Sequence, residues 1–97
     1  MTPPDFVLHW RMPYVSMFYG IIIRMFHNDH NPPHFYAVYQ GQRAVFDFNG
    51  NMQSGNLTSK SALRMIREWA KRHKVELKEN WELARDGKNI NQISPLE

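Results

Sequence analysis

Histidines gather in one short polar segment of this 97-residue chain, and they are its residues best suited to chemistry. Between His27 and Tyr36 the sequence reads His-Asn-Asp-His-Asn-Pro-Pro-His-Phe-Tyr, so His30 and His34 stand on either side of a Pro-Pro pair. Imidazole titrates near neutral pH, which makes both side chains candidates for general acid–base catalysis. Because proline fixes φ, the Pro-Pro pair would hold the two rings in a set relation. The alternative is an ordinary β-turn with histidines on its rim.

The strands expected on either side of this segment would bring more polar side chains to the histidines. Side chains alternate between the faces of a strand, so Tyr36 shares a face with His34. Asp47 falls on the same face of the next strand, and Arg24 can join from the preceding one. Arg binds phosphate through two hydrogen bonds while His or Tyr moves a proton. The expected catalytic set is therefore His30, His34, Tyr36, Arg24 and Asp47. The alternative is an exposed Arg24–Asp47 ion pair worth ~0–1 kcal/mol.

A second candidate site is a run of positive charge in the C-terminal half. Residues 60–74 hold six basic side chains against one acidic residue, Glu68, a net charge of +5. Such a cluster is typical of a surface that binds the phosphate backbone of a nucleic acid, although a solvated helix face has the same composition. The expected nucleic-acid-binding residues are Lys60, Arg64, Arg67, Lys71, Arg72 and Lys74.

A metal centre and a nucleotide cofactor are both disfavoured. Metal sites need three or four converging ligands, whereas His30 and His34 supply two, with Asp29 as a candidate third. The chain has no Cys, which removes disulfides, thiolate nucleophiles and Cys-ligated zinc. It also lacks a glycine-rich phosphate loop and a G-x-S-x-G nucleophile turn. We therefore expect neither a metal nor a cofactor.

Length and composition predict a single domain over residues 1–97. The 42% hydrophobic and 13% aromatic content is enough for a thin core and argues against disorder. No apolar run approaches the roughly 18 residues of a membrane span, and no secretory signal opens the chain, so we expect a cytoplasmic protein. Met12 offers a second start, which makes residues 1–11 an expected extension or arm. Residues 89–97 read as a tail docked on the surface.

The expected fold is α+β. Residues 17–26, 34–39, 42–48 and 51–54 have the composition of strands, separated by turn signals at residues 28–33, Gln40–Gly41 and Asn49–Gly50. These links are too short for parallel crossovers, so we expect an antiparallel meander of three or four strands.

From Thr58 onward the spacing of apolar residues becomes helical. Thr58 or Ser59 can cap a first helix, and a second stretch over residues 75–85 ends before Gly87. The join near His73 leaves two alternatives open, two helices or one long kinked helix. One or two C-terminal helices should therefore cover one face of the sheet, with Trp69 and Trp81 in the core.

Three stretches of the chain resemble a small bacterial family, domain of unknown function 4160. These are Met-Phe-Tyr-Gly-Ile-Ile-Ile-Arg-Met-Phe from Met17, Asn-Asp-His-Asn-Pro-Pro-His-Phe from Asn28, and Glu-Asn-Trp-Glu-Leu-Ala-Arg-Asp-Gly-Lys from Glu79. The resemblance runs over residues 12–96. It implies an operon-encoded protein paired with a second small protein, in an arrangement interpreted as a toxin–antitoxin module. The family usually has a third histidine where this chain has Tyr36, and that departure argues further against a metal.

Two classes of function follow. The leading expectation is a toxin-like protein that acts on RNA, as a metal-independent ribonuclease or as an RNA-binding protein, with a small partner protein encoded nearby. The alternative is a non-catalytic interaction module, either an antitoxin or a nucleic-acid-binding regulator. Pairing of a partner through an edge strand of the small sheet is a third mode of action. The oligomeric state stays open.

Overall fold

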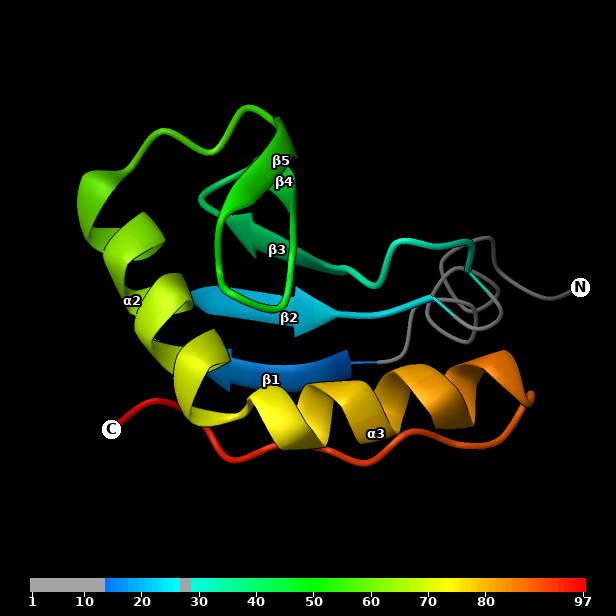
Figure 1. Cartoon of the computed structure of the whole chain (residues 1–97). Coiled ribbons are helices and arrows are strands. Elements are labelled where there is room, and N and C mark those ends of the chain that lie inside the picture. Colours follow the sequence, from blue (N-terminus) through cyan, green and yellow to red (C-terminus); the bar gives the residue numbers. More distant parts are fainter. Residues whose placement is uncertain (1–13, 27–28) are drawn as a thin grey trace, which may run out of the picture.

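The computed structural model describes residues 14–26 and 29–97, which form one antiparallel sheet and two helices (Figure 1). The strands lie in the order of the sequence, and each pairs antiparallel with the next. They are β1 (Tyr14–Phe18), β2 (Ile21–Arg24), β3 (Phe35–Tyr39), β4 (Gln42–Phe46) and β5 (Met52–Gly55), followed by α2 (Lys60–Arg72) and α3 (Lys74–Arg85). The α+β class and the antiparallel meander are confirmed, with five strands in place of three or four.

The additional strand arises from a turn inside the stretch expected to be one strand, residues 17–26. Tyr19 and Gly20 have φ values of 50° and 82°, the backbone of a two-residue turn that reverses the chain. This turn separates β1 from β2. The expectation of a single strand is wrong because the apolar residues on both sides conceal the turn, and Tyr19 is not one of the usual turn residues.

Several strand boundaries differ slightly from expectation. β2 ends at Arg24 and not at residue 26, β3 begins at Phe35 and not at His34, and β5 ends at Gly55 and not at residue 54. β4 ends at Phe46 and not at Phe48, because Asp47 already belongs to the following turn, where the backbone N–H of Gly50 donates to its carbonyl at 3.0 Å. β5 begins at Met52, one residue later than expected.

One face of the sheet packs against the helices and forms the core. Phe35 and Phe46, inward-facing residues of β3 and β4, are fully buried. The ring of Trp69 in α2 lies 5.7 Å from that of Phe35, centroid to centroid. Trp81 in α3 lies 6.1 Å from Phe48. Trp69 and Trp81 are 0% and 4% exposed, which confirms their expected place in the core.

The helical region consists of two helices because the chain leaves helical geometry at His73, where φ is −118°. The hydroxyl of Ser59 caps the start of α2 by accepting a hydrogen bond from the backbone N–H of Ala62. Buried residues recur along one side of α2, as helical periodicity requires: Ala62, Ile66, Trp69 and Ala70.

The C-terminal tail runs back along the helices and reaches β1. The backbone N–H of Ile93 donates to the carbonyl of Val15 at 2.9 Å, so the tail occupies part of the outer edge of β1. The indole N–H of Trp69 donates to the carbonyl of Ser94, also at 2.9 Å. Ile93 and Leu96 are buried. The tail therefore belongs to the same core as the sheet and the helices.

The expected N-terminal extension, with Met12 as the second start, lies outside the described residues, as does His27. No helix in residues 14–26 and 29–97 is long and apolar enough to cross a membrane. His30 and His34 lie in residues 29–34, which precede β3 at the end of the sheet away from α2 (Figure 1).

Candidate functional site

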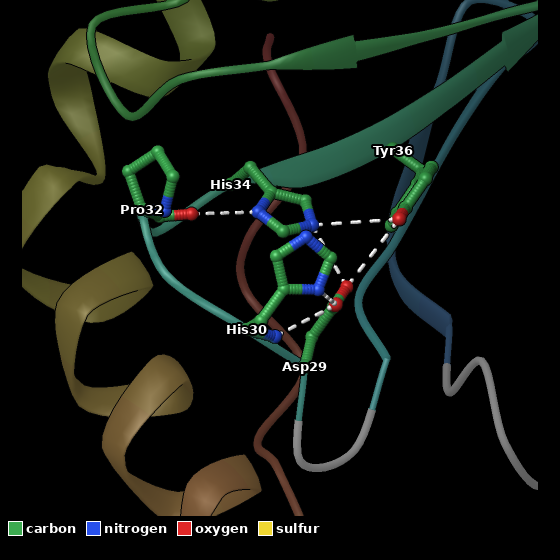
Figure 2. A network of polar contacts seen from close by, with 5 residues as sticks. All are labelled: Asp29, His30, Pro32, His34 and Tyr36. Carbon is green, nitrogen blue, oxygen red and sulfur yellow. Dashed lines mark hydrogen bonds and ion pairs between the residues drawn. The ribbon is translucent and has the colours of Figure 1, made fainter.

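The candidate site lies where the connection between β2 and β3 returns to the sheet. Figure 2 shows the side chains of His30, His34 and Tyr36 converging on the carboxylate of Asp29. Asp29 and His34 meet across the bend that contains the Pro-Pro pair.

The Asp29 carboxylate is the common partner of the polar side chains in this group, with hydrogen bonds from His34 and Tyr36 and an ion-pair contact to the ring of His30. Its Oδ2 atom lies 2.7 Å from Nε2 of His34 and 3.3 Å from the hydroxyl oxygen of Tyr36. Its Oδ1 atom lies 3.1 Å from Nδ1 of His30 and 2.8 Å from the backbone nitrogen of His30. The side chain of Asp29 is only 10% exposed, so these donors replace most of its water. Asp29 is the organising residue of the site.

The imidazole of His34 is held through both of its ring nitrogens. Nδ1 lies 2.7 Å from the carbonyl oxygen of Pro32, which can only accept, and Nε2 faces the Asp29 carboxylate. The ring is therefore held between the Pro32 carbonyl and the Asp29 carboxylate. The ring is 10% exposed and lies 5.3 Å from the indole of Trp81. His34 therefore has no ring nitrogen directed at an outside molecule.

The imidazole of His30 is in the opposite situation, because its side chain is 87% exposed. Its Nδ1 atom lies within ion-pair distance of the Asp29 carboxylate, and Nε2 has no hydrogen-bond partner among the described residues. Because Nδ1 faces the carboxylate, Nε2 is the ring nitrogen left open to an outside molecule. Of the two expected histidines, His30 is the one that a substrate can reach.

Tyr36 joins the site from the beginning of β3. Its burial, the negative charge of Asp29 and the hydrogen bond to that carboxylate raise the pKa of the Tyr36 hydroxyl above its ordinary value. The hydroxyl therefore stays protonated and donates to Asp29 at neutral pH. Its ring lies 5.0 Å from that of Phe26, edge to face. The structure thus brings together His30, His34 and Tyr36, as expected, around a carboxylate that the expected set did not include.

The structure places the other two members of the expected set in different surroundings. Arg24 is the neighbour of Tyr36 across the β2–β3 ladder, so both residues belong to the same face of the sheet. Asp47, by contrast, binds its own turn: Oδ1 accepts from the backbone N–H groups of Asn49 and Asn51, and Oδ2 accepts from the amide of Gln53. The Asp-Phe-Asn-Gly sequence is a turn signal that could have identified this role.

The basic residues of the C-terminal half do not form one surface with the histidines, because α2 lies at the other end of the sheet (Figure 1). Arg72 pairs with Glu68 at 2.7 Å, and Lys74 donates to the side chain of Asn49 at 2.6 Å. The remaining four cations recur at helical spacing along the exposed side of α2 and are named here the α2 stripe: Lys60, Arg64, Arg67 and Lys71.

Within residues 14–26 and 29–97, no three His, Asp or Glu side chains are grouped so that they could hold a metal ion. The reason at this site is geometric. Nε2 of His34 and Nδ1 of His30 are directed at the Asp29 carboxylate itself and not at a shared point outside it. The arrangement is suited to orienting an imidazole and moving a proton.

Comparison with known proteins identifies a family over the central part of the chain. The family model described as domain of unknown function (DUF4160) matches residues 20–82, a shorter stretch than the one on which the resemblance rested. The match covers all the described residues of the site together with β2 to β5, α2 and most of α3. No curated protein and no solved structure matches the chain. Since the matched residues make up more than half of its length, the chain belongs to the DUF4160 family.

Proposed function

We propose that this protein is a metal-independent ribonuclease and the toxin component of a bacterial toxin–antitoxin-type module. The observation that carries the proposal is the imidazole of His30, which is 87% exposed and oriented by a buried carboxylate. An imidazole held in this way is a suitable general base near neutral pH.

In the proposed reaction, Nε2 of His30 removes the proton from a ribose 2′-hydroxyl group. The 2′-oxygen attacks the adjacent phosphorus, and the bond to the 5′-oxygen breaks, with the proton returned to that leaving oxygen. Asp29 stabilises the imidazolium that forms, as the orienting carboxylate of a catalytic pair does. Arg24, which lies opposite Tyr36 in the β2–β3 register, would stabilise the negative charge that develops on phosphate.

The residues around Asp29 have a positioning role in this proposal. His34 and Tyr36 donate to Oδ2 of Asp29 and so fix the carboxylate that orients His30. The protein would act in the cytoplasm, where a small partner protein encoded nearby would neutralise it. The partner assignment follows from the family resemblance and not from the geometry.

The test is cleavage of a labelled single-stranded RNA by the purified chain in the presence of a metal chelator. We expect the wild type to produce fragments ending in a 2′,3′-cyclic phosphate, and His30→Gln to lose about 10²–10⁴-fold in rate, the usual contribution of a general base. Expression in bacteria should slow growth for the wild type and not for His30→Gln.

His73→Gln provides a matched control. Nδ1 of His73 also faces a carboxylate, that of Glu76 at 2.6 Å, but the pair lies at the junction of α2 and α3 and outside the site. This variant should cleave RNA as the wild type does. Equal cleavage by His30→Gln and the wild type, or intact RNA with both, would refute the ribonuclease proposal.

A second function, that of a non-catalytic nucleic-acid-binding regulator, is supported by the α2 stripe. No ion pair to any of its four cations occurs within the described residues. Replacing all four with Gln should then weaken DNA or RNA binding and reduce the slope of log K against log salt by about one unit for each phosphate that is no longer neutralised. An unchanged slope would rule this function out.

A further inference from the structure

The two edges of the sheet differ in what they pair with. At the outer edge of β1 the C-terminal tail adds an extended segment, where the backbone N–H of Ile93 donates to the carbonyl of Val15 at 2.9 Å. At the other edge lies β5, and no described residue pairs with its outer side. All four residues of β5 are exposed, whereas each of the other strands contains buried residues. The outer side of β5 is therefore the open edge of the described sheet.

The backbone of β5 presents a donor and an acceptor on this open side. The carbonyl of Asn51 accepts from the backbone N–H of Asp47 at 3.0 Å, so the N–H of Met52, trans to that carbonyl in the same peptide group, points away from β4. The carbonyl of Gly55 also points outward, because the N–H of the next residue donates to the carbonyl of Arg43 at 3.0 Å. β5 contains no charged residue and no proline, two features that commonly block pairing at a sheet edge.

Cations lie at both ends of this edge. Arg43 is exposed and lies where β5 ends, since its carbonyl accepts from the N–H of Asn56. Arg67 is exposed and lies beside the turn that precedes β5, because a Cβ atom added at Gly50 would come 2.4 Å from its Cα atom. Among the residues that the structure describes, neither arginine has an ion pair. The carboxylate of Asp47 in this turn already accepts from two backbone N–H groups and an amide.

We infer that the open edge of β5 is a docking site for an extended acidic segment of a partner protein, which adds to the sheet as a further strand. Main-chain hydrogen bonds to Met52 and Gly55 hold the segment, and its carboxylates pair with Arg43 and Arg67. The tail on β1 shows that this sheet takes up an extended segment at its other edge. The inference does not rest on the proposed ribonuclease, because none of the residues around Asp29 takes part.

A second copy of the chain suits this edge less well than an acidic segment. Antiparallel pairing of two β5 strands places the Arg43 end of one copy beside the Arg67 end of the other. Like charges that meet in this way oppose association. An acidic strand, by contrast, satisfies both the outward backbone groups and the cations at the two ends.

The test is binding of a fluorescently labelled peptide of four Glu-Val repeats to the purified chain, followed by anisotropy. A peptide of four Lys-Val repeats is the charge-reversed probe, and we expect only the acidic peptide to bind. Hydrogen exchange at the amide of Met52 should then slow by about tenfold or more, because this N–H gains a partner in the complex. The amide of Asp47, already bonded to Asn51 in the free protein, should change far less.

Substitutions separate the backbone contribution from the charge contribution. Met52→Pro removes the outward N–H and should weaken peptide binding by about 2- to 10-fold relative to Met52→Ala, which keeps it. Arg43→Gln combined with Arg67→Gln changes two exposed side chains and should weaken binding by about 2- to 30-fold. The matched control is Lys78→Gln combined with Lys88→Gln. It removes two exposed charges from α3 and the residues after it, away from β5 (Figure 1), and should bind as the wild type does.

Absence of binding by the acidic peptide, or equal binding of the two peptides, would overturn the inference. An unchanged Met52 amide in the complex would overturn it as well, because the peptide would then bind without strand pairing. So would a dimer of the free chain that Met52→Pro dissociates, since a second copy would then occupy the edge. Weaker binding in the double Arg variant and not in the double Lys variant, with a slowed Met52 amide in the wild type, would support it.

Discussion

Asp29 and His34 meet through a contact of 2.7 Å between Oδ2 and Nε2, and both side chains are 10% exposed. The same imidazole donates from Nδ1 to the carbonyl of Pro32, so one ring ties the carboxylate to the loop backbone. Because Asp29 also orients His30, this contact links a buried structural pair to an exposed imidazole. Stability and proton transfer can therefore be separated by substitutions at these positions.

Asp29→Asn should lower the free energy of unfolding by about 2–4 kcal/mol, because the amide leaves the buried His34 imidazole without its anionic partner. The loss should be near the lower end of that range, since the Asn oxygen still accepts one hydrogen bond. Urea denaturation at neutral pH measures it.

Asp47→Asn is the control for that measurement. Its carboxylate also accepts several hydrogen bonds, but from backbone N–H groups and an amide in an exposed turn. Asn is well tolerated in such turns, so we expect a loss below about 1 kcal/mol. Equal losses of unfolding free energy in the two variants would mean that the Asp29–His34 pair stabilises the fold no more than the exposed carboxylate of Asp47 does.

The two histidines should differ sharply when each is replaced by Ala. His30→Ala removes a side chain that is 87% exposed, and its unfolding free energy should stay within about 0.5 kcal/mol of the wild type. His34→Ala deprives a buried carboxylate of its partner and removes the packing against Trp81, and should cost about 3 kcal/mol or more. Thermal unfolding followed by circular dichroism would show the contrast. A similar loss for both variants would contradict the assignment of His30 as the accessible group.

The raised pKa of Tyr36 predicts a loss of stability in alkali. The folded state holds the phenolic proton more tightly than the unfolded state does. The stabilisation that protonated Tyr36 gives to the folded state is therefore fully present below the ordinary tyrosine pKa of about 10. It then falls as the pH rises through the folded-state pKa. Urea denaturation between about pH 8 and about pH 11 should therefore show a smaller decline for Tyr36→Phe than for the wild type. Parallel declines in the two proteins would refute the assignment.

The fold was largely predictable because its turns and its helices have local signals. Gln40–Gly41 and Asn49–Gly50 mark two reversals of the chain, and helical spacing of apolar residues marks α2. The turn at Tyr19–Gly20 was missed because its residues continue an apolar run, and only the backbone with φ of 50° and 82° reveals it. The number of strands was therefore underestimated.

The site was less predictable because the contact between Asp29 and His34 depends on how the loop folds, which no periodicity of the sequence shows. Strand alternation correctly grouped Arg24 with Tyr36, but it assigned Asp47 to the histidines without accounting for the turn that its carboxylate binds. The role of Asp29 depends on how the loop folds back, which brings its carboxylate to the side chain of His34, five residues later. Alternation also cannot predict that the His34 ring packs on Trp81, because that contact depends on where α3 lies.

The turn between β4 and β5 offers a test of how closely the sheet must approach α2. A Cβ atom added at Gly50 would lie 2.4 Å from the Cα atom of Arg67, which is backbone in the middle of a helix and cannot yield without displacing α2. At Gly41 the φ value is similar, +78° against +84°, but nothing lies within 4 Å of the added atom. Gly41→Ala should therefore cost about 1 kcal/mol, from the left-handed backbone alone.

Gly50→Ala bears the same backbone cost and the clash in addition, so it should destabilise the protein by about 3 kcal/mol or more. Urea denaturation of the two variants side by side separates the two causes, because Gly41→Ala measures the backbone contribution by itself. If both variants were destabilised equally, the hairpin would not be in close contact with α2. A larger effect at Gly50 would show that this contact fixes the position of α2, and with it the α2 stripe, relative to the sheet.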